Sequence, residues 1–443
     1  MNTANDRVNI ASYVQVLQTL GRFHLLPHLQ FLYTERNKPQ LLFFGSPCLR
    51  TFRADRCLTR SANADHDHMQ SFLDLLPHTS PKTLALFIQF SLREKCLHAV
   101  RRMSELQFLI MDAENIDSRL SLGADFLTNF ASRQTLIGWD LRGNISVAPL
   151  PASGFTVLEF DSLIYLSFMS KCDTSIAEYT PLLLAGNFPS LVRMDVCLTV
   201  DHTLGQSLSP TKLWRNFFKH LRSATTNSLF MIEVKITGTT ACQVLFEDLP
   251  NLQLFTLDSF KTNLFHSLTA DNLCMMSTCW PELTTLCISG VDKVTIGVSS
   301  LVEIANLFPF LEDLQIEINC KTFPSVDDVP VLQHNLETLK LSPLLLEHHI
   351  ALARCIDRIF PKIVLLNVYG SEQFLKSGTG KEIQEMYEGL QSARRDQRKR
   401  DNVFIPSTFH WEPHTTCTHI YHVSDWIPSR IMRWNFPRLK FYL

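Results

Sequence analysis

The sequence is long, rich in apolar residues and almost neutral, which excludes several classes of protein. It has 443 residues, of which 45% are apolar and 19% charged, with a formal net charge of -2. This composition supplies a large core and argues against disorder and against nucleic-acid binding through overall charge. Residues 1–10 lack the basic and apolar regions of a signal peptide, and no apolar run reaches the roughly 18 residues of a membrane span. We therefore expect a soluble intracellular protein, cytoplasmic or nuclear.

The first elements expected along the chain are a capping helix and two strands. Residues 8–17 have the pattern of a short amphipathic helix, which would cover the exposed end of a repeat array. The next strands are marked by apolar residues at positions 1, 4 and 6. Asn or Cys follows at position 9, where a side chain can bond the backbone of a turn. The residues of these two units are Leu29, Leu32 and Asn37, then Leu49, Phe52, Ala54 and Cys57.

Residues 60–180 are less regular. Strands are predicted there at 84–87, 106–111 and 163–168 from the 1-4-6 spacing alone. The string Asp65-His66-Asp67-His68 offers four metal ligands, but adjacent residues seldom converge on one ion without ligands from elsewhere, so we interpret it as a solvated loop.

The clearest motif is a bulky apolar residue followed by proline and then by the 1-4-6 spacing. Proline cannot continue a helix and favours extended geometry in the residue before it, so each copy should end a helix and begin a strand. Asn319 occupies position 9 of the fourth copy, and Leu336, Leu339 and Leu341 supply a further strand without proline. The five copies have their apolar positions at Leu191, Met194 and Val196; at Leu252, Phe255 and Leu257; at Leu283, Leu286 and Ile288; at Leu311, Leu314 and Ile316; and at Ile363, Leu366 and Val368.

Amphipathic helices are predicted between these strands. One begins at Ser209-Pro210, a good cap and first helical position, and precedes a strand at Leu229, Ile232 and Val234. In another, Ser300 and Glu303 have the spacing of a capping box. The apolar faces of the three helices contain Leu213, Phe217 and Leu221; Leu301, Ile304, Ala305 and Phe308; and Ile350, Ala353, Ile356 and Phe360.

The repetition predicts the fold. The prolines at 250, 281 and 309 are about 30 residues apart, a period typical of solenoids, and the 1-4-6 spacing with one helix per unit is that of leucine-rich repeats. We predict an α/β leucine-rich-repeat solenoid, curved, with a parallel sheet on its concave side and helices on its convex side. The expected domains are a capping region at 1–25, the solenoid at 26–370, and a polar, basic helix with an aromatic tail at 371–443.

Cysteines and sites for small ligands give weak signals. The twelve cysteines include no CxxC pair, and Cys197, Cys274, Cys287 and Cys355 lie in apolar strings, so we expect reduced, buried thiols. Residues 377–382 resemble a phosphate-binding loop but have Glu382 where that motif needs Ser or Thr.

The C-terminal region contains two further weak candidates for a functional site. The histidines and cysteine of residues 410–422 match no zinc spacing, and the basic run at 394–400 is interpreted as a solvated helix end, with a nuclear localisation signal or a phosphate contact as alternatives. We therefore predict no catalytic residue, metal or cofactor.

The quoted repeats resemble those of fungal, chiefly basidiomycete, F-box-like proteins with leucine-rich repeats. The strings that carry the resemblance are Leu268 to Leu273 with Cys279 to Leu283, Val298 to Ile304 with Leu307 to Leu314, and Ile359 to Pro361. Members of that family are similar to target-recognition subunits of ubiquitin ligases, whose F-box docks on the ligase. This sequence departs from the family pattern because it shows no F-box. We expect that the F-box has been truncated or has decayed.

Two classes of function follow from these observations. The first is a non-enzymatic protein-interaction module, in its most specific form an F-box-like ubiquitin-ligase adaptor whose concave face binds a protein partner. The second is a nucleotide- or metal-binding enzyme that uses residues 378–381 or the C-terminal His/Cys cluster. Because strand residues alternate between faces, a partner surface is predicted at positions 3, 5 and 7, with an acidic centre that suits a basic partner. Its residues are Arg193, Asp195, Asp258, Asp313, Gln315, Glu317, Lys340, Asn367 and Tyr369.

Overall fold

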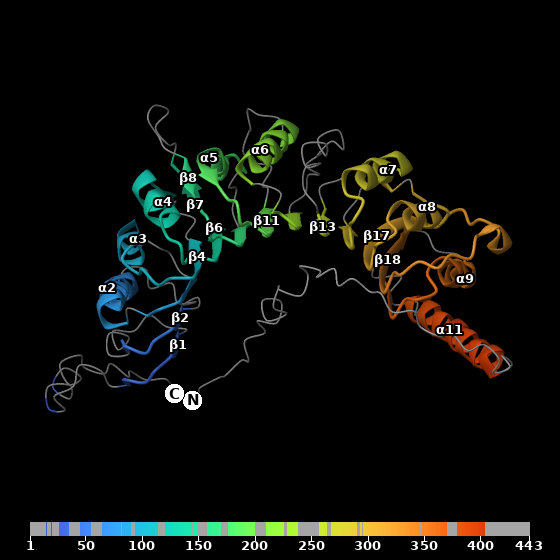
Figure 1. Cartoon of the computed structure of the whole chain (residues 1–443), viewed down its shortest axis with the longest axis horizontal. Coiled ribbons are helices and arrows are strands. Elements are labelled where there is room, and N and C mark those ends of the chain that lie inside the picture. The colour runs from blue at the N-terminus through green and yellow to red at the C-terminus, as the bar shows by residue number, and fades with distance from the viewer. Residues whose placement is uncertain are drawn as a thin grey trace, which may run out of the picture. The chain divides into compact units, whose positions relative to one another are not determined.

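A computed structural model describes most of the chain and shows a mixed α/β fold built on one large parallel sheet (Figure 1). The sheet has 13 strands, and their order in space is their order in the sequence. The sheet is not closed on itself: β1 and β19 are its two ends. The described residues are 15, 19, 26–34, 45–54, 64–80, 82–89, 94–113, 120–143, 145–148, 157–169, 176–199, 210–225, 228–237, 257–263, 267–289, 293–294, 296–344, 348–369 and 379–403.

Every strand pair in this sheet is parallel, as the sequence predicted. Three additional two-stranded pairs lie outside the main sheet: β5 (Leu120–Leu122) with β7 (Ile145–Val147), β8 (Leu158–Glu159) with β10 (Gly186–Asn187), and β14 (Ser267–Leu268) with β16 (Lys293–Val294). The main strands are β1 (Phe31–Thr34), β2 (Thr51–Ala54), β3 (Ala85–Gln89), β4 (Phe108–Ala113), β6 (Gly138–Gly143), β9 (Tyr165–Met169), β11 (Arg193–Thr199), β12 (Met231–Thr237), β13 (Ser259–Thr262), β15 (Thr285–Ile288), β17 (Asp313–Asn319), β18 (Thr338–Leu344) and β19 (Leu365–Val368).

Helices pack on one face of the sheet and share a single hydrophobic core with it (Figure 1). Most of the predicted 1-4-6 residues lie in this core, and Leu286, Leu314 and Leu339 are fully buried. Helix residues such as Leu301 and Ile356 belong to the same cluster. The helices are α2 (Ala64–Thr79), α3 (Glu94–Val100), α4 (Ala124–Ala131), α5 (Thr180–Ala185), α6 (Pro210–Ala224), α7 (Ala270–Cys279), α8 (Ser300–Leu307), α9 (His349–Ile359) and α11 (Thr379–Val403), with 3-10 turns at Ile176–Glu178 and Val326–Asp328.

The predicted proline junctions have the expected geometry. Helices α7, α8 and α9 end immediately before Trp280, Phe308 and Phe360, each of which is followed by proline. The N–H of Leu311 then donates to the carbonyl of Phe308 at 3.1 Å, which closes the turn into the strand. At the other end of β17 the side chain of Asn319 accepts a hydrogen bond from the N–H of Lys321 at 3.0 Å, as predicted for position 9.

Two helix details differ from the predictions. Ser300 is the first residue of α8 and not its cap, and the helix has no side-chain cap, so the predicted capping box is wrong. A capping box is present instead on α7, where the N–H of Asn272 donates to the Thr269 hydroxyl at 3.2 Å. On α9, Ile350 is 47% exposed because it lies in the first turn, ahead of the buried residues of that helix.

The register of one strand also differs from the prediction. The strand of this unit is β13 at Ser259–Thr262, and residues 252–256 of the expected strand lie outside the described part. Phe260 pairs with Ile232 of β12 and Leu286 of β15, so Leu257 takes position 1 and Phe260 position 4. The neighbouring strands therefore determine a register that the local apolar pattern leaves ambiguous. Strand β6, with Trp139 stacked on Phe130 at 5.7 Å, was not predicted.

Other expectations need correction or fall outside the described residues. The string Asp65 to His68 lies within α2 and not in a loop. Of the four cysteines expected to be buried, Cys355 is buried, Cys197 and Cys287 are half-buried and Cys274 is exposed, because its side of α7 faces away from the core. Residues 8–14, Asn37, Cys57 and 404–443 lie outside the described part, and with them most of the predicted capping helix and the C-terminal His/Cys cluster.

The chain divides into two compact units, Met1–Ser392 and Ala393–Leu443. The polar helix predicted at 381–400 is present as α11. Within the first unit its residues Ile383 and Tyr387 join the core, and the Tyr387 hydroxyl donates to the carbonyl of Phe360 at 3.0 Å. No helix among the described residues is long and apolar enough to cross a membrane.

Candidate binding surface on the open face of the sheet

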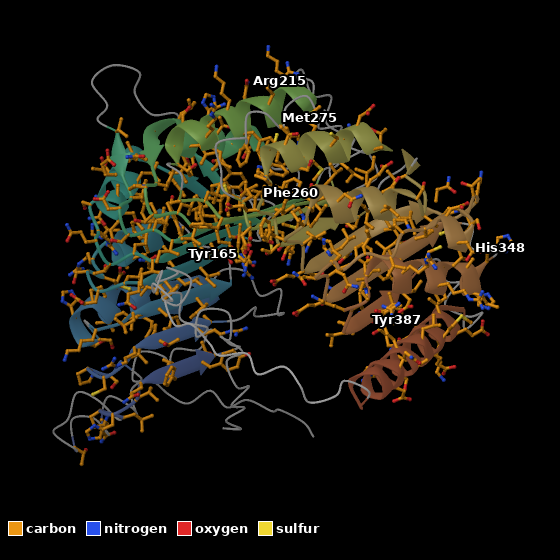
Figure 2. All side chains as sticks on the ribbon, turned by 45° about the vertical axis from the view of Figure 1, so that its right-hand side comes forward. Tyr165, Arg215, Phe260, Met275, His348 and Tyr387 are labelled. Carbon is orange, nitrogen blue, oxygen red and sulfur yellow. The ribbon has the colours of Figure 1, made fainter. Side chains whose placement is uncertain are left out.

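The face of the sheet opposite the helices presents polar side chains, and we call it the open face. Along β17, Leu314, Ile316 and Ile318 are fully buried, whereas Asp313 and Glu317 are half-buried. This is the period-two alternation of a strand with one covered face. In Figure 2, Arg215 and Met275 lie on the helix side, Phe260 lies between helices and sheet, and Tyr165 lies on the opposite side.

The register brings charged residues from neighbouring strands into rows on this face. Residues at position 5 of the strands β6, β9, β11, β12 and β13 pair directly. Adjacent members of such a row are about 4.8 Å apart, the spacing of strands in a sheet. This row consists of Asp140, Ser167, Asp195, Glu233 and Lys261.

Carboxylates of this row form hydrogen bonds and ion pairs with cations two residues away on the same strand. Arg193 donates from Nε to Asp195 Oδ1 at 3.0 Å and from Nη2 to Asp195 Oδ2 at 2.9 Å. The Tyr165 hydroxyl donates to Asp195 Oδ2 at 3.1 Å, and the Arg193 guanidinium lies 5.7 Å from the Tyr165 ring centroid. Burial, with the neighbouring Asp195 carboxylate, raises the pKa of Tyr165, so the phenol stays protonated and donates. We call Asp140, Arg142, Arg193, Asp195, Glu233 and Lys235 the charge ladder.

Asp140 is the most buried member of the charge ladder, with 2% of its surface exposed. Arg142 donates to its Oδ2 from Nε at 2.9 Å and from Nη2 at 2.6 Å. Burial raises the pKa of Asp140 above its ordinary value, although the Arg142 guanidinium and the Ser167 hydroxyl oppose the shift. The pair is therefore a fixed, largely desolvated feature of the surface.

Glu233 lies close to Arg193 of the neighbouring strand and to the lysines Lys235 and Lys261. It pairs with Lys235 on the same strand and lies 3.8 Å from Arg193 Nη2. Burial disfavours its ionisation, but Lys235, Lys261 and Arg193 outweigh burial and lower the pKa of Glu233. Cys287 continues the position-5 row beside Lys261, and burial raises the pKa of its thiol against the opposing effect of Lys261 and Lys340. The thiol is therefore protonated at neutral pH.

A second polar group, which we call the C-terminal group, occupies β17, β18 and β19. Gln315 pairs with Lys340, and Lys340 pairs with Asn367. Burial, with smaller effects of nearby groups that include Glu317, raises the pKa of Tyr369 to about 12. The members of this group are Asp313, Gln315, Glu317, Lys340, Asn367 and Tyr369.

The structure thus places eight of the nine predicted partner-binding residues on the open face, in two separate groups. Arg193 and Asp195 belong to the charge ladder, and the other six form the C-terminal group. The charge ladder ends on β12, so β13 and β15 lie between the two groups. Asp258 does not belong to either group. It precedes β13 because that strand begins later than predicted, and Lys261 occupies the open face there. The expected acidic centre is therefore wrong: the face carries both signs of charge.

Several residues of this surface were not predicted, although the pattern that finds them is present. Glu233 and Lys235 occupy positions 5 and 7 of a strand whose apolar positions were recognised. Asp140 and Arg142 were missed because their strand was missed. An acidic and a basic residue two positions apart, between buried strand residues, is the signal that identifies all three pairs of the charge ladder.

The alternative sites for small ligands gain no support from the described residues. No group of three or more His, Cys, Asp or Glu side chains that could hold a metal ion occurs among them. Lys381 lies in the first turns of α11 and forms an ion pair with Glu385 at 3.3 Å, which directs it along the helix. The C-terminal His/Cys cluster lies outside this part of the chain.

Comparison with known proteins gives no family for the chain. No protein-family model matches the sequence, and no curated protein matches it significantly.

Proposed function

We propose that this chain is a leucine-rich-repeat solenoid that works as a protein-interaction module, with the open face of its sheet as the partner-binding surface. The observation that supports this proposal is the row arrangement: 13 parallel strands in sequence order align their open-face side chains across the sheet. A parallel sheet usually has both faces covered, so an open polar face calls for a function. Extended arrays of this kind are the surfaces that repeat proteins use for macromolecular partners.

The more specific proposal is that of a target-recognition adaptor for a ubiquitin ligase. It rests on the resemblance of the repeats around Trp280-Pro281 and Phe308-Pro309 to F-box-like proteins. In such an adaptor the open face would bind the target and a separate surface would bind the ligase. Co-purification of this chain with the ligase subunit that binds F-boxes tests the second requirement, and no association would leave the interaction module without the adaptor role.

The binding face is tested by placing a photo-crosslinking amino acid at single positions. Gln315 and Asn367 lie on the open face, and Glu303 is exposed on the helix side as a matched control. Partners should crosslink from the two open-face positions and not from position 303. Equal crosslinking from both sides would contradict the assignment.

A further inference from the structure

A second surface runs along the edge where the strands begin. The residue just before each strand donates its N–H to the carbonyl of the equivalent residue of the preceding unit, as in Val192 to Ile164 at 2.9 Å and Phe230 to Val192 at 2.9 Å. Twelve such bonds connect all 13 units, and we call these residues the strand-start row. In order they are Gln30, Arg50, Leu84, Gln107, Ile137, Ile164, Val192, Phe230, Asp258, Thr284, Glu312, Glu337 and Val364.

The chemistry of the strand-start row changes abruptly at its middle. Ile137, Ile164, Val192 and Phe230 follow one another without interruption; the first three are half-buried and Phe230 is 40% exposed. The four form a continuous apolar strip, whereas single exposed apolar residues would need no explanation. This strip is a candidate contact for apolar side chains of a partner.

The next four positions are polar and mainly acidic. Asp258 is half-buried, and Glu312 and Glu337 are exposed. Within the described residues none of these three carboxylates forms an ion pair, in contrast to the carboxylates of the charge ladder. Like charges on neighbouring strands repel each other, and this repulsion destabilises the free protein. A bound cationic partner would offset the repulsion.

We propose that the strand-start row is a docking surface for an amphipathic helix of a partner protein. Apolar side chains of this helix would contact Ile137 to Phe230, and Lys or Arg side chains on the same helix face would contact Asp258 to Glu337. The proposal concerns a surface distinct from the open face and does not depend on what the open face binds.

The spacing of the row favours a helix over an extended segment. Neighbouring units are about 4.8 Å apart, so each block of four residues spans roughly 14 Å. Side chains three or four residues apart on a helix are about 5 to 6 Å apart, close to the spacing of the row. Alternate side chains of an extended strand are nearly 7 Å apart and would lose register within a few units. Each block corresponds to about 10 helical residues.

The test uses the full chain and synthetic helical peptides of about 20 residues that carry a fluorescent label. One half of each peptide presents leucines on one face, and the other half presents lysines on the same face; both orders of the two halves are made. The matched peptides have glutamate in place of lysine. Binding is measured by fluorescence anisotropy at two salt concentrations, because the ionic contacts should weaken in high salt.

Wild-type protein should bind one of the lysine peptides about tenfold more tightly than its glutamate counterpart. The double variant Glu312→Lys/Glu337→Lys should reverse that preference, and Phe230→Ser should weaken binding of both peptides. The controls Glu303→Lys on α8 and Asp313→Lys/Glu317→Lys on the open face should keep the wild-type preference. Circular dichroism checks that each variant is folded.

Two results would overturn the proposal. The first is a wild-type protein that does not discriminate between lysine and glutamate peptides. The second is a preference that survives Glu312→Lys/Glu337→Lys but is lost in Asp313→Lys/Glu317→Lys, which would assign the peptide to the open face. Failure of the crosslinking experiment at Gln315 and Asn367 would affect only the function proposed for the open face.

Discussion

The strands β6 to β12 and the strands β17 to β19 share one sheet but place their buried polar groups differently. In the first region a carboxylate on the open face, Asp140, is buried and held by Arg142. In the second region the open-face residues Asp313 and Glu317 remain half-buried, and one of the buried polar side chains is His334, at the turn before β18. The comparison teaches that one face can hold charges in two ways: the first region buries Asp140 against Arg142, and the second keeps Asp313 and Glu317 partly exposed to solvent.

A large effect should follow from breaking the most buried pair of the charge ladder. In Arg142→Met the Asp140 carboxylate keeps its burial but loses two hydrogen bonds, which should lower the free energy of unfolding by about 3 kcal/mol at pH 7. Urea denaturation measures the change. The double variant Asp140→Asn/Arg142→Met removes the stranded charge and should recover part of the loss.

The pH dependence of this loss has a definite sign. The folded-state pKa of Asp140 is already raised by burial, and removal of Arg142 removes an opposing effect. A carboxyl whose folded pKa exceeds its unfolded pKa destabilises the fold progressively as pH rises through that folded pKa. The defect of Arg142→Met should therefore be smaller in acid than at pH 7, and a pH-independent defect would contradict the comparison.

The covered face should respond alike in both regions. Leu141 of β6, at position 6 of its unit, and Leu314 of β17, at position 4, are both fully buried in the core. Leu141→Ala and Leu314→Ala should each cost about 2 to 5 kcal/mol, because each opens a cavity. Gln315→Ala, on the open face of β17, should change stability by less than about 0.5 kcal/mol. A large difference between the two leucine variants would mean that the regions differ in packing and not only in their polar groups.

Such core residues are what the sequence predicts best, because the 1-4-6 spacing and the preceding pair of a bulky apolar residue and proline are local patterns. Leu286 and Leu314 follow from that spacing alone, and the period-two alternation then identifies the open face. The register of β13 could not be obtained in this way. The string Leu252 to Leu257 has an acceptable spacing of its own, and only the pairing of Phe260 with Leu286 decides against it. Pairing with neighbouring strands is a non-local interaction that the local pattern does not contain.

The hydrogen bonds of His334 are a second feature that the local sequence pattern does not predict. In several other units the N–H of the first leucine donates to the backbone carbonyl three residues earlier, as Leu311 does to Phe308 at 3.1 Å. At the junction before β18, Leu336 donates instead to Nδ1 of His334 at 3.0 Å. The other ring nitrogen, Nε2, then carries the proton and donates to the Phe308 carbonyl at 2.8 Å. This contact joins two successive units, so the sequence around His334 alone does not reveal it.

A smaller and pH-dependent effect is expected at His334. Burial, helped by the charge of Lys362 and opposed by the Phe308 carbonyl, lowers the pKa of His334, so the ring contributes stability that is present at neutral pH. That contribution should be lost as pH falls below about 6.5, the unfolded value, and through the lowered folded pKa. His334→Phe should cost about 1 to 3 kcal/mol at pH 7 and less in acid. The exposed His98 of α3 offers a control, since His98→Gln should change the free energy of unfolding at pH 7 by less than about 0.5 kcal/mol.

The smallest effect on stability is expected for charge reversal in the C-terminal group, where the comparison predicts a change in binding instead. Asp313→Lys/Glu317→Lys should alter the free energy of unfolding by less than about 0.5 kcal/mol, because both side chains are half-exposed at the surface. The matched variant in the charge ladder, Asp195→Lys, breaks hydrogen bonds from Arg193 and Tyr165 and should cost about 1 to 3 kcal/mol.

Affinity for a partner crosslinked through Gln315 should fall about tenfold or more in the Asp313→Lys/Glu317→Lys variant. Urea denaturation measures the change in the free energy of unfolding, and an affinity titration measures the change in binding. If the C-terminal reversal destabilised the protein as strongly as Asp195→Lys and left affinity unchanged, its charges would be structural, like those of the charge ladder, and the binding surface would have to lie elsewhere. Asp195 lies at position 5 of its strand, whereas Asp313 and Glu317 lie at positions 3 and 7 of theirs. All three are carboxylates of the open face, so the two variants compare a carboxylate held by Arg193 and Tyr165 with two that the proposed partner would contact.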